Sequence, residues 1–161
     1  FIAATNLNNE VPLYLESGKY EPHPSFKTYS NAMDVGDPSN FARVLDLYKH
    51  SHEAIKADIS GATYTNEQIA ETMKAVWQTE KYLLDPHGAC GYRALQEGLQ
   101  ADETGIFLET AHPAKFKDTV EEIIGEEIAI PEKLQAFMRG EKQSIEMSKQ
   151  FADFKSYLLS V

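Results

Sequence analysis

Only two stretches of this chain have the pattern of a buried β-strand, and this small number constrains the fold more than any other feature. Phe1–Asn6 is largely apolar from its first residue, and Ile106–Leu108 is a short continuous apolar run. Such runs are typical of a parallel sheet covered on both faces. Because two strands are marginally stable by themselves, we expect a piece of a longer protein whose other strands lie upstream. A natural processed terminus is the alternative.

Helical signals fill most of the remaining sequence. Thr65 and Gln68 have the spacing of a capping box, and Asp85 followed by Pro86 has the pattern of an N-cap with proline at the first helical position. The alternation of strands and helices predicts an α/β protein with few parallel strands and many helices. Apolar spacing predicts helices at 11–17, 41–48, 54–59, 65–77, 86–99, 116–124, 131–138 and 144–159, and a short strand at 127–130.

The segment Val11–Ser39 is unusual because it contains four prolines and two glycines. These residues leave room for one short helix, with Leu13, Tyr14 and Leu15 on its buried side. The stretch Ser30–Asn40 is crowded with Asn, Asp, Gly and Ser. Dense polar residues in a loop beside a sheet suit a ligand-binding mouth, but the same residues also dominate ordinary turns. Periodicity leaves these two interpretations open.

Composition excludes several classes of function. The 161 residues include 25 acidic and 15 basic side chains, a net charge of −10, which argues against a nucleic-acid surface. No apolar run approaches the roughly 18 residues of a membrane helix. Cys90 is the single cysteine, so no internal disulfide forms, and we expect a reducing, cytoplasmic location.

From residue spacing alone, Cys90 and His87 are the strongest candidates for catalytic residues. They are three residues apart on a predicted helix, so a thiol nucleophile beside an imidazole is one interpretation. A buried, inert cysteine is the alternative, since small residues surround it and small residues permit close helix packing. The five histidines have no cysteine or carboxylate at ligand spacing, so we predict no metal site. Neither a dinucleotide-binding glycine motif nor a P-loop is present.

Four stretches, in order and at the right separations, resemble the C-terminal part of threonine synthase, in the longer-chain branch of that family. They are Phe-Ile-Ala-Ala-Thr-Asn-Leu-Asn-Asn-Glu-Val-Pro at 1–12, Ser-Asn-Ala-Met-Asp-Val-Gly-Asp-Pro-Ser-Asn-Phe at 30–41, Leu-Asp-Pro-His-Gly-Ala-Cys-Gly-Tyr at 84–92 and Glu-Thr-Ala-His-Pro-Ala-Lys-Phe at 109–116. The resemblance spans residues 1–138 and leaves 139–161 as a C-terminal helical extension. Gly88 and Cys90 depart from the family pattern, which favours a small β-branched and an aliphatic residue there.

The resemblance implies a specific function for the whole protein. Threonine synthase is a pyridoxal-phosphate enzyme of the tryptophan-synthase-β-like fold, also called fold type II. It converts O-phosphohomoserine and water to L-threonine and phosphate. The family's Schiff-base lysine and phosphate-binding loop both precede the matched region, so the resemblance implies that the catalytic lysine lies upstream and that this chain alone is inactive. A non-catalytic α/β interaction domain and a thiol enzyme using Cys90 and His87 are the alternative functions.

One cofactor contact and four candidates for the substrate mouth follow. Thr110 ends the predicted strand that begins at Ile106, and ligands of open α/β sheets collect at the carboxyl ends of strands. The resemblance implies that the Thr110 hydroxyl contacts the pyridine nitrogen of the cofactor; the alternative is that Thr110 caps the helix after Pro113. The substrate-mouth candidates are Asn6, Asn31, Asp34 and His112.

Overall fold

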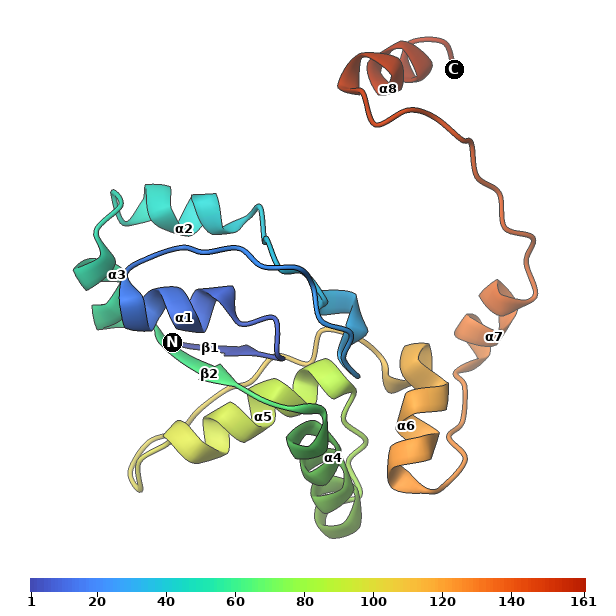
Figure 1. The fold of residues 1–161 in the computed structure, drawn as a ribbon. Coiled ribbons are helices and arrows are strands. Elements are labelled where there is room, and N and C mark those ends of the chain that lie inside the picture. The colour runs from blue at the N-terminus through green and yellow to red at the C-terminus, as the bar shows by residue number, and fades with distance from the viewer. The chain divides into compact units, whose positions relative to one another are not determined.

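The computed structural model describes all 161 residues, which divide into two compact units, Phe1–Ala129 and Ile130–Val161. The first unit contains a two-stranded parallel sheet of β1 (Ile2–Thr5) and β2 (Ser60–Thr63), in which Ile2 lies opposite Ser60. Helix α1 (Glu10–Ser17) packs on one face of this sheet and α5 (Pro86–Gly98) contacts β1 from the other (Figure 1). Helices on both faces of a parallel sheet confirm the predicted α/β class.

An apolar cluster joins α1 to the helices that follow the proline-rich segment. Tyr14 and Leu15 from α1 pack with Phe41 of α2 (Phe41–Leu47) and Ile55 of α3 (His52–Asp58). The rings of Tyr14 and Phe41 meet edge to face with centroids 4.9 Å apart. Leu13, expected to be buried, is 43% exposed. Its neighbours Tyr14 and Leu15 take the positions that are buried in the cluster with α2 and α3.

The capping signals give the observed helix starts. Helix α4 (Asn66–Glu80) begins after Thr65, whose hydroxyl accepts the Gln68 N–H while the Gln68 side chain accepts the Thr65 N–H. Helix α5 begins after Asp85, whose carboxylate accepts the His87 N–H at 2.8 Å. The 3₁₀ helices η1 (Asn31–Met33) and η2 (Pro113–Phe116) lie in the connections, and α6 (Lys117–Ile124) follows η2 directly.

The second strand is not the predicted one. Ile106–Leu108 has no partner strand among the 161 residues and forms no ladder, with Ile106 86% and Leu108 75% exposed. An apolar run becomes a strand only where a neighbouring strand accepts its backbone hydrogen bonds. The segment instead lies extended along α5, where Phe107 contacts Tyr92 edge to face at 5.4 Å.

The observed partner of β1 is Ser60–Thr63, which directly follows the helix predicted at 54–59 and was not predicted as a strand. Its residues are small and only weakly apolar, so they carry little strand signal. Gly61 shows why they are small: a Cβ at this position would lie 2.8 Å from Cα of Pro12 in α1. Glycine in a strand often marks such a close backbone approach.

The second unit contains α7 (Glu132–Met138) and α8 (Phe151–Leu158). Helix α7 confirms the prediction, whereas the predicted helix at 144–159 forms only in its second half. Neither helix buries a side chain within its unit, and short helices gain most of their stability from such burial. The residues 127–130, predicted as a short strand, form no regular element.

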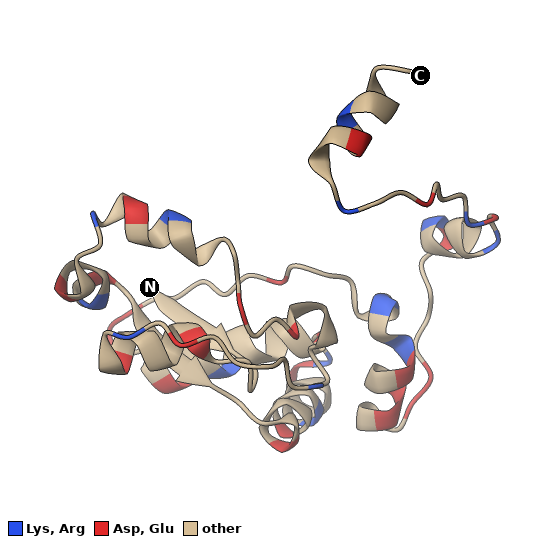
Figure 2. Ribbon diagram, turned by 45° about the horizontal axis from the view of Figure 1, so that its top comes forward, with Lys and Arg blue, Asp and Glu red and all other residues tan.

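None of the helices is long and apolar enough to cross a bilayer. Lysine and arginine are interspersed with acidic residues along the helices, as on α6, where Lys117 pairs with Glu121 (Figure 2).

Candidate functional site

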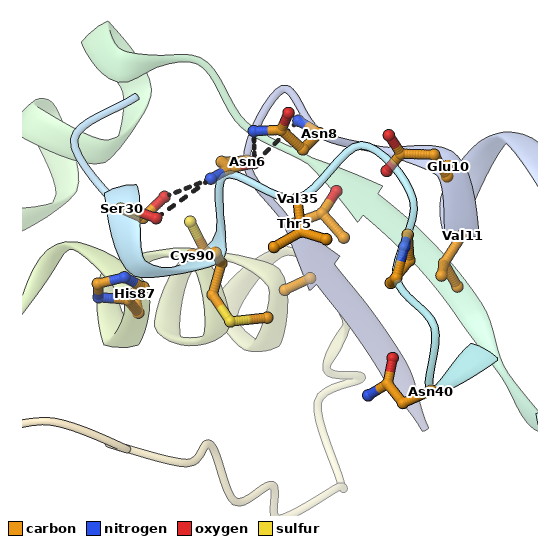
Figure 3. A pocket seen from close by; sticks show the side chains of 13 residues that line it. Thr5, Asn6, Asn8, Glu10, Val11, Ser30, Val35, Asn40, His87 and Cys90 are labelled. Carbon is orange, nitrogen blue, oxygen red and sulfur yellow. Dashed lines mark hydrogen bonds between the residues drawn. The ribbon is translucent and has the colours of Figure 1, made fainter. Parts of the chain in front are cut away.

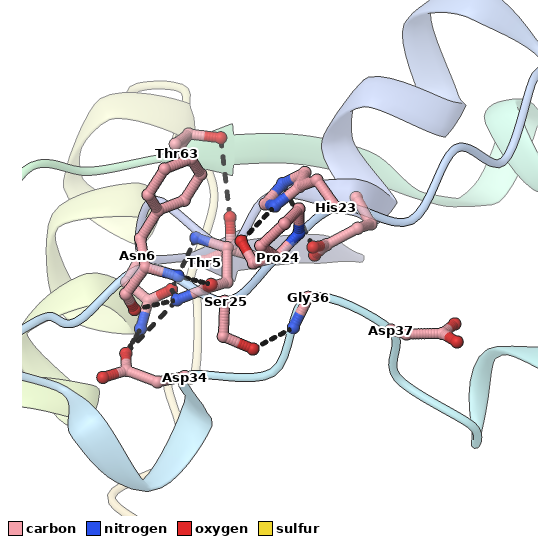
Figure 4. Close-up of polar contacts among 12 residues, drawn as sticks. Thr5, Asn6, His23, Pro24, Ser25, Asp34, Gly36, Asp37 and Thr63 are labelled. Carbon is pink, nitrogen blue, oxygen red and sulfur yellow. Dashed lines mark hydrogen bonds and ion pairs between the residues drawn. The ribbon is translucent and has the colours of Figure 1, made fainter.

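A buried hydrogen-bond network ties the end of β1 to the polar loop. Asn6 is 3% exposed, and its side-chain amide donates to Oγ1 of Thr28 at 2.8 Å, to Oγ of Ser30 at 2.9 Å and to Oδ1 of Asp34 at 3.1 Å. Asp34 also accepts from the Thr28 hydroxyl at 2.7 Å and from the Thr28 N–H at 2.9 Å. Asn8 joins the network through Oδ1 of Asn6 (Figures 3 and 4). The network holds residues 28–34 against the carboxyl end of β1.

The four substrate-mouth candidates therefore differ in what their side chains do. The polar side-chain atoms of Asn6 and Asp34 all form hydrogen bonds within the network, so these two residues fix the conformation of the loop. Asn31 begins η1, is exposed and makes no side-chain hydrogen bond within the chain. His112 is also exposed, and its Nδ1 accepts the Ala114 N–H at 3.1 Å, which makes it the N-cap of η2. Asn6 and Asp34 meet in the network, and the Asp34 N–H donates to the Asn31 carbonyl at 3.2 Å, whereas His112 makes no hydrogen bond to any of the three.

A cavity of about 230 Å³ lies between this loop and α5. It is lined by β1, by the start of α1, by the loop and by two residues of α5, His87 and Cys90 (Figure 3). Glu10 also lines this cavity (Figure 3), although its side chain is almost fully buried. One of its carboxylate oxygens lies 3.1 Å from Nε2 of His23. A carboxylate and several amides beside an apolar wall are typical of a site for a small polar ligand.

A second cavity of about 510 Å³ lies on the other side of His87. Its apolar wall comes from Ile2, Gly91, Leu95 and Phe107, and Thr110 stands at its edge. The two cavities share Ala4, Met33 and His87. No lysine lines either of them.

Thr110 ends the extended segment that begins at Ile106. Its hydroxyl makes no hydrogen bond within the chain, and the residue that caps η2 is His112. The alternative role for Thr110, as the cap of the following helix, is therefore wrong.

Three titratable side chains cluster at the start of α5. Asp85 is fully buried, and its Oδ1 lies 2.6 Å from Nδ1 of His87. The Asp85 N–H donates to Oε1 of Glu109 at 2.8 Å. Burial acts to raise the pKa of Asp85, but hydrogen bonds from His87 and Glu109 outweigh it and lower that pKa. Burial and the neighbouring Asp85 carboxyl raise the pKa of Glu109 to about 7.

Cys90 does not provide a nucleophile. It is buried, its thiol donates weakly to the Pro86 carbonyl at 3.6 Å, and burial raises its pKa to about 12. The imidazole of His87 is hydrogen-bonded to Asp85. A thiol that stays protonated at neutral pH lacks the reactive thiolate, so the thiol-enzyme alternative is wrong.

Sequence reasoning missed Glu109 and Glu10 as members of the site. Each lies within a motif of the family resemblance, but a lone glutamate carries no periodic signal. The one available signal was Gly88, which departs from the family pattern. A Cβ at Gly88 would lie 2.5 Å from Cδ of Glu109, so the missing side chain makes room for this carboxyl group.

Comparison with known proteins agrees with the resemblance in the sequence. The family model described as threonine synthase, C-terminal, matches residues 88–158. The threonine synthase of Haemophilus influenzae is 43% identical over 159 residues, and that of Serratia marcescens is 39% identical over 161 residues. These matches cover 99% and 100% of this chain but only 37% of each relative. The chain thus spans little more than a third of the length of these relatives.

Solved structures give the same result. The crystal structure of Escherichia coli threonine synthase matches with a TM-score of 0.83 and 37% identity, covering 99% of this chain and 37% of that one. A pyridoxal-phosphate-bound threonine synthase from Brucella melitensis matches with a TM-score of 0.80 and 28% identity, covering 98% of this chain and 39% of that one. In sequence and in fold, the chain belongs to the threonine synthase family and corresponds to its C-terminal part.

Proposed function

We propose that this chain is the C-terminal part of a cytoplasmic threonine synthase of fold type II, which converts O-phosphohomoserine and water to L-threonine and phosphate. The observation that carries the proposal is the free hydroxyl of Thr110 at the edge of an apolar cavity, in a chain similar to threonine synthases along its whole length. The rest of the protein and the small phosphorylated substrate are the partners that this function requires.

The residues around the second cavity fit pyridoxal phosphate. Its apolar wall suits the faces of a flat aromatic ring, and the Thr110 hydroxyl is free to hydrogen-bond the ring nitrogen. A hydroxyl donates to an unprotonated nitrogen, whereas a carboxylate would hold that nitrogen protonated. When bound, the cofactor supplies the electron sink for carbanions of the substrate. The lysine that holds it covalently comes from outside this chain, consistent with cavities that no lysine lines.

The first cavity is the proposed place for the substrate. Asn6 and Asp34 act there indirectly, because their network fixes the loop that forms the wall. Asn31 is exposed and uncommitted, so it is the mouth candidate whose side chain is free to contact the substrate. A contact between His112 and the substrate stays a prediction.

The test uses the full-length protein that carries this segment. With pyridoxal phosphate and O-phosphohomoserine, we expect phosphate and L-threonine to form in equal amounts. Unphosphorylated homoserine is the matched control and should give no threonine, since it lacks the leaving phosphate. Phosphate release without threonine, or no release at all, would overturn the proposal.

A further inference from the structure

Two buried carboxyl oxygens at the start of α5 lack a hydrogen-bond partner. They are Oδ2 of Asp85 and Oε2 of Glu109. The other oxygen of each group is occupied: Oδ1 of Asp85 accepts from the N–H of His87, and Oε1 of Glu109 accepts from the N–H of Asp85. A buried carboxylate oxygen without a partner is costly, so two in one cluster require a physical explanation.

A single proton satisfies both oxygens. Asp85 already receives the backbone N–H of His87 and lies 2.6 Å from its Nδ1, and hydrogen bonding to an oxygen favours its ionised form. Glu109 receives only one N–H, so it is the better place for the proton. The carboxyl groups of Asp85 and Glu109 lie within hydrogen-bonding reach of each other. A proton on Oε2 of Glu109 can therefore be donated to Oδ2 of Asp85, which would give each of the four carboxyl oxygens a partner.

No lysine or arginine replaces this proton. Neither Asp85 nor Glu109 forms an ion pair with a lysine or arginine. The titratable groups that face the pair are His87 and Cys90, both on α5, and Cys90 lies close enough to sense the charge of Asp85. Two ionised carboxylates in such a site repel each other, and one of them binds a proton instead.

The pair lies where it controls the proposed cofactor contact. Glu109 directly precedes Thr110, and its carboxyl group accepts the N–H of Asp85, the N-cap residue of α5. The same Asp85 holds the His87 ring, which lines both cavities. Gly88 provides the space for the carboxyl group. The hydrogen bond from the Asp85 N–H to the Glu109 carboxyl group therefore fastens the Thr110 segment to the start of the helix that forms the cavity wall.

We propose that Glu109 is a positioning residue that carries a proton shared with Asp85 and thereby holds Thr110 and His87 at the ligand cavity. The positioning role rests on the proposed function, but the shared proton does not. Losing the proton leaves two facing carboxylates, and their repulsion loosens the segment that carries Thr110.

The shared proton is tested in the full-length protein without cofactor or substrate. Infrared difference spectra between pH 6 and pH 9 should show a protonated carboxyl band that disappears as the pH rises through 7. Glu109→Gln should remove this band, whereas Glu127→Gln, an exposed glutamate with no partner, should leave it unchanged. A wild-type spectrum without such a band would overturn the proposal and requires no variant to fold.

The positioning role is tested in the holoenzyme. In the wild-type holoenzyme, activity should fall as the pH rises through 7, because the pair loses its proton. Glutamine can accept the Asp85 N–H with its carbonyl and donate its NH₂ to Oδ2. Glu109→Gln should therefore keep kcat and no longer show this fall. Glu109→Ala should lower kcat on the order of 10²-fold, the cost of an ångström-scale misplacement of a reacting group.

The outcomes separate the two proposals. If the wild-type holoenzyme shows no turnover but the carboxyl band is present, the proposed function is wrong and the shared proton between Asp85 and Glu109 is supported. If turnover is normal and Glu109→Ala keeps wild-type kcat and pH profile, the positioning role is wrong.

Discussion

Gly88 and Glu109 occupy complementary space: a Cβ at Gly88 would lie 2.5 Å from Cδ of Glu109 and closer still to its Oε2. The glycine lies in the first turn of α5, where backbone geometry does not require it. A side chain at position 88 would therefore require the carboxyl group of Glu109 to move.

This relationship predicts that Gly88→Ala changes the free energy of unfolding in opposite directions, depending on whether Glu109 is present. Gly88→Ala in the wild-type protein should lower the free energy of unfolding by about 1–3 kcal/mol, the usual cost of overpacking. In a Glu109→Ala background the same change should raise it by up to about 1 kcal/mol, because alanine favours a helix over glycine. Urea unfolding of the four proteins in this cycle measures both effects. Equal losses in both backgrounds would show that the two positions do not compete for space.

The raised pKa of Glu109 predicts how stability depends on pH. The folded protein binds this proton up to about pH 7, whereas the unfolded chain releases it near its ordinary value of 4.5. Between these values the folded state holds more protons, so stability falls as the pH rises and levels off above 7. Glu109→Gln should remove this part of the slope. The check is the pH dependence of the urea midpoint, with Glu127→Gln as control; identical slopes in wild type and Glu109→Gln would contradict it.

Thr110→Val keeps the shape of the side chain and removes the hydroxyl. In the holoenzyme it should weaken pyridoxal-phosphate binding by about 1 kcal/mol or more and reduce turnover, with little change in melting temperature because the hydroxyl has no partner in this chain. Cofactor titration by absorbance measures the affinity. If the variant keeps wild-type cofactor affinity and turnover, Thr110 does not contact the cofactor.

Asn31 and Asn6 form a matched pair of loop variants. Asn31→Ala removes an exposed amide without a partner, so turnover should fall while thermal stability stays near wild type. Asn6→Ala deletes a buried amide that serves several partners, so it should cost about 1–3 kcal/mol of stability or more. Thermal unfolding and specific activity, measured on both variants, distinguish the roles. If Asn31→Ala keeps its specific activity, the polar residues of this loop serve its turns and do not bind a ligand.

The isolated chain should be catalytically inactive. It has the proposed pyridine contact, but no lysine lines its cavities. Purified chain, incubated with pyridoxal phosphate and O-phosphohomoserine, should release no more phosphate than a protein-free control. Turnover above that control would show that the catalytic group lies within these residues.

Local signals in the sequence were enough to place most helices. The capping box of Thr65 and Gln68 and the Asp85-Pro86 start each work through hydrogen bonds or backbone angles within a few residues. The family could also be recognised, because its motifs are contiguous stretches of sequence. These features need no knowledge of how distant segments meet.

Only the tertiary structure decided which segments pair and which carboxyl groups meet. Ser60–Thr63 becomes a strand because β1 pairs with it, and Gly61 leaves room for α1 to approach closely. The more apolar Ile106–Leu108 has no partner strand in this chain. Asp85 and Glu109 are 24 residues apart, and neither has a sequence pattern that announces the other. Strand pairing and shared protons depend on contacts between distant parts of the chain, and such contacts exist only after the chain has folded.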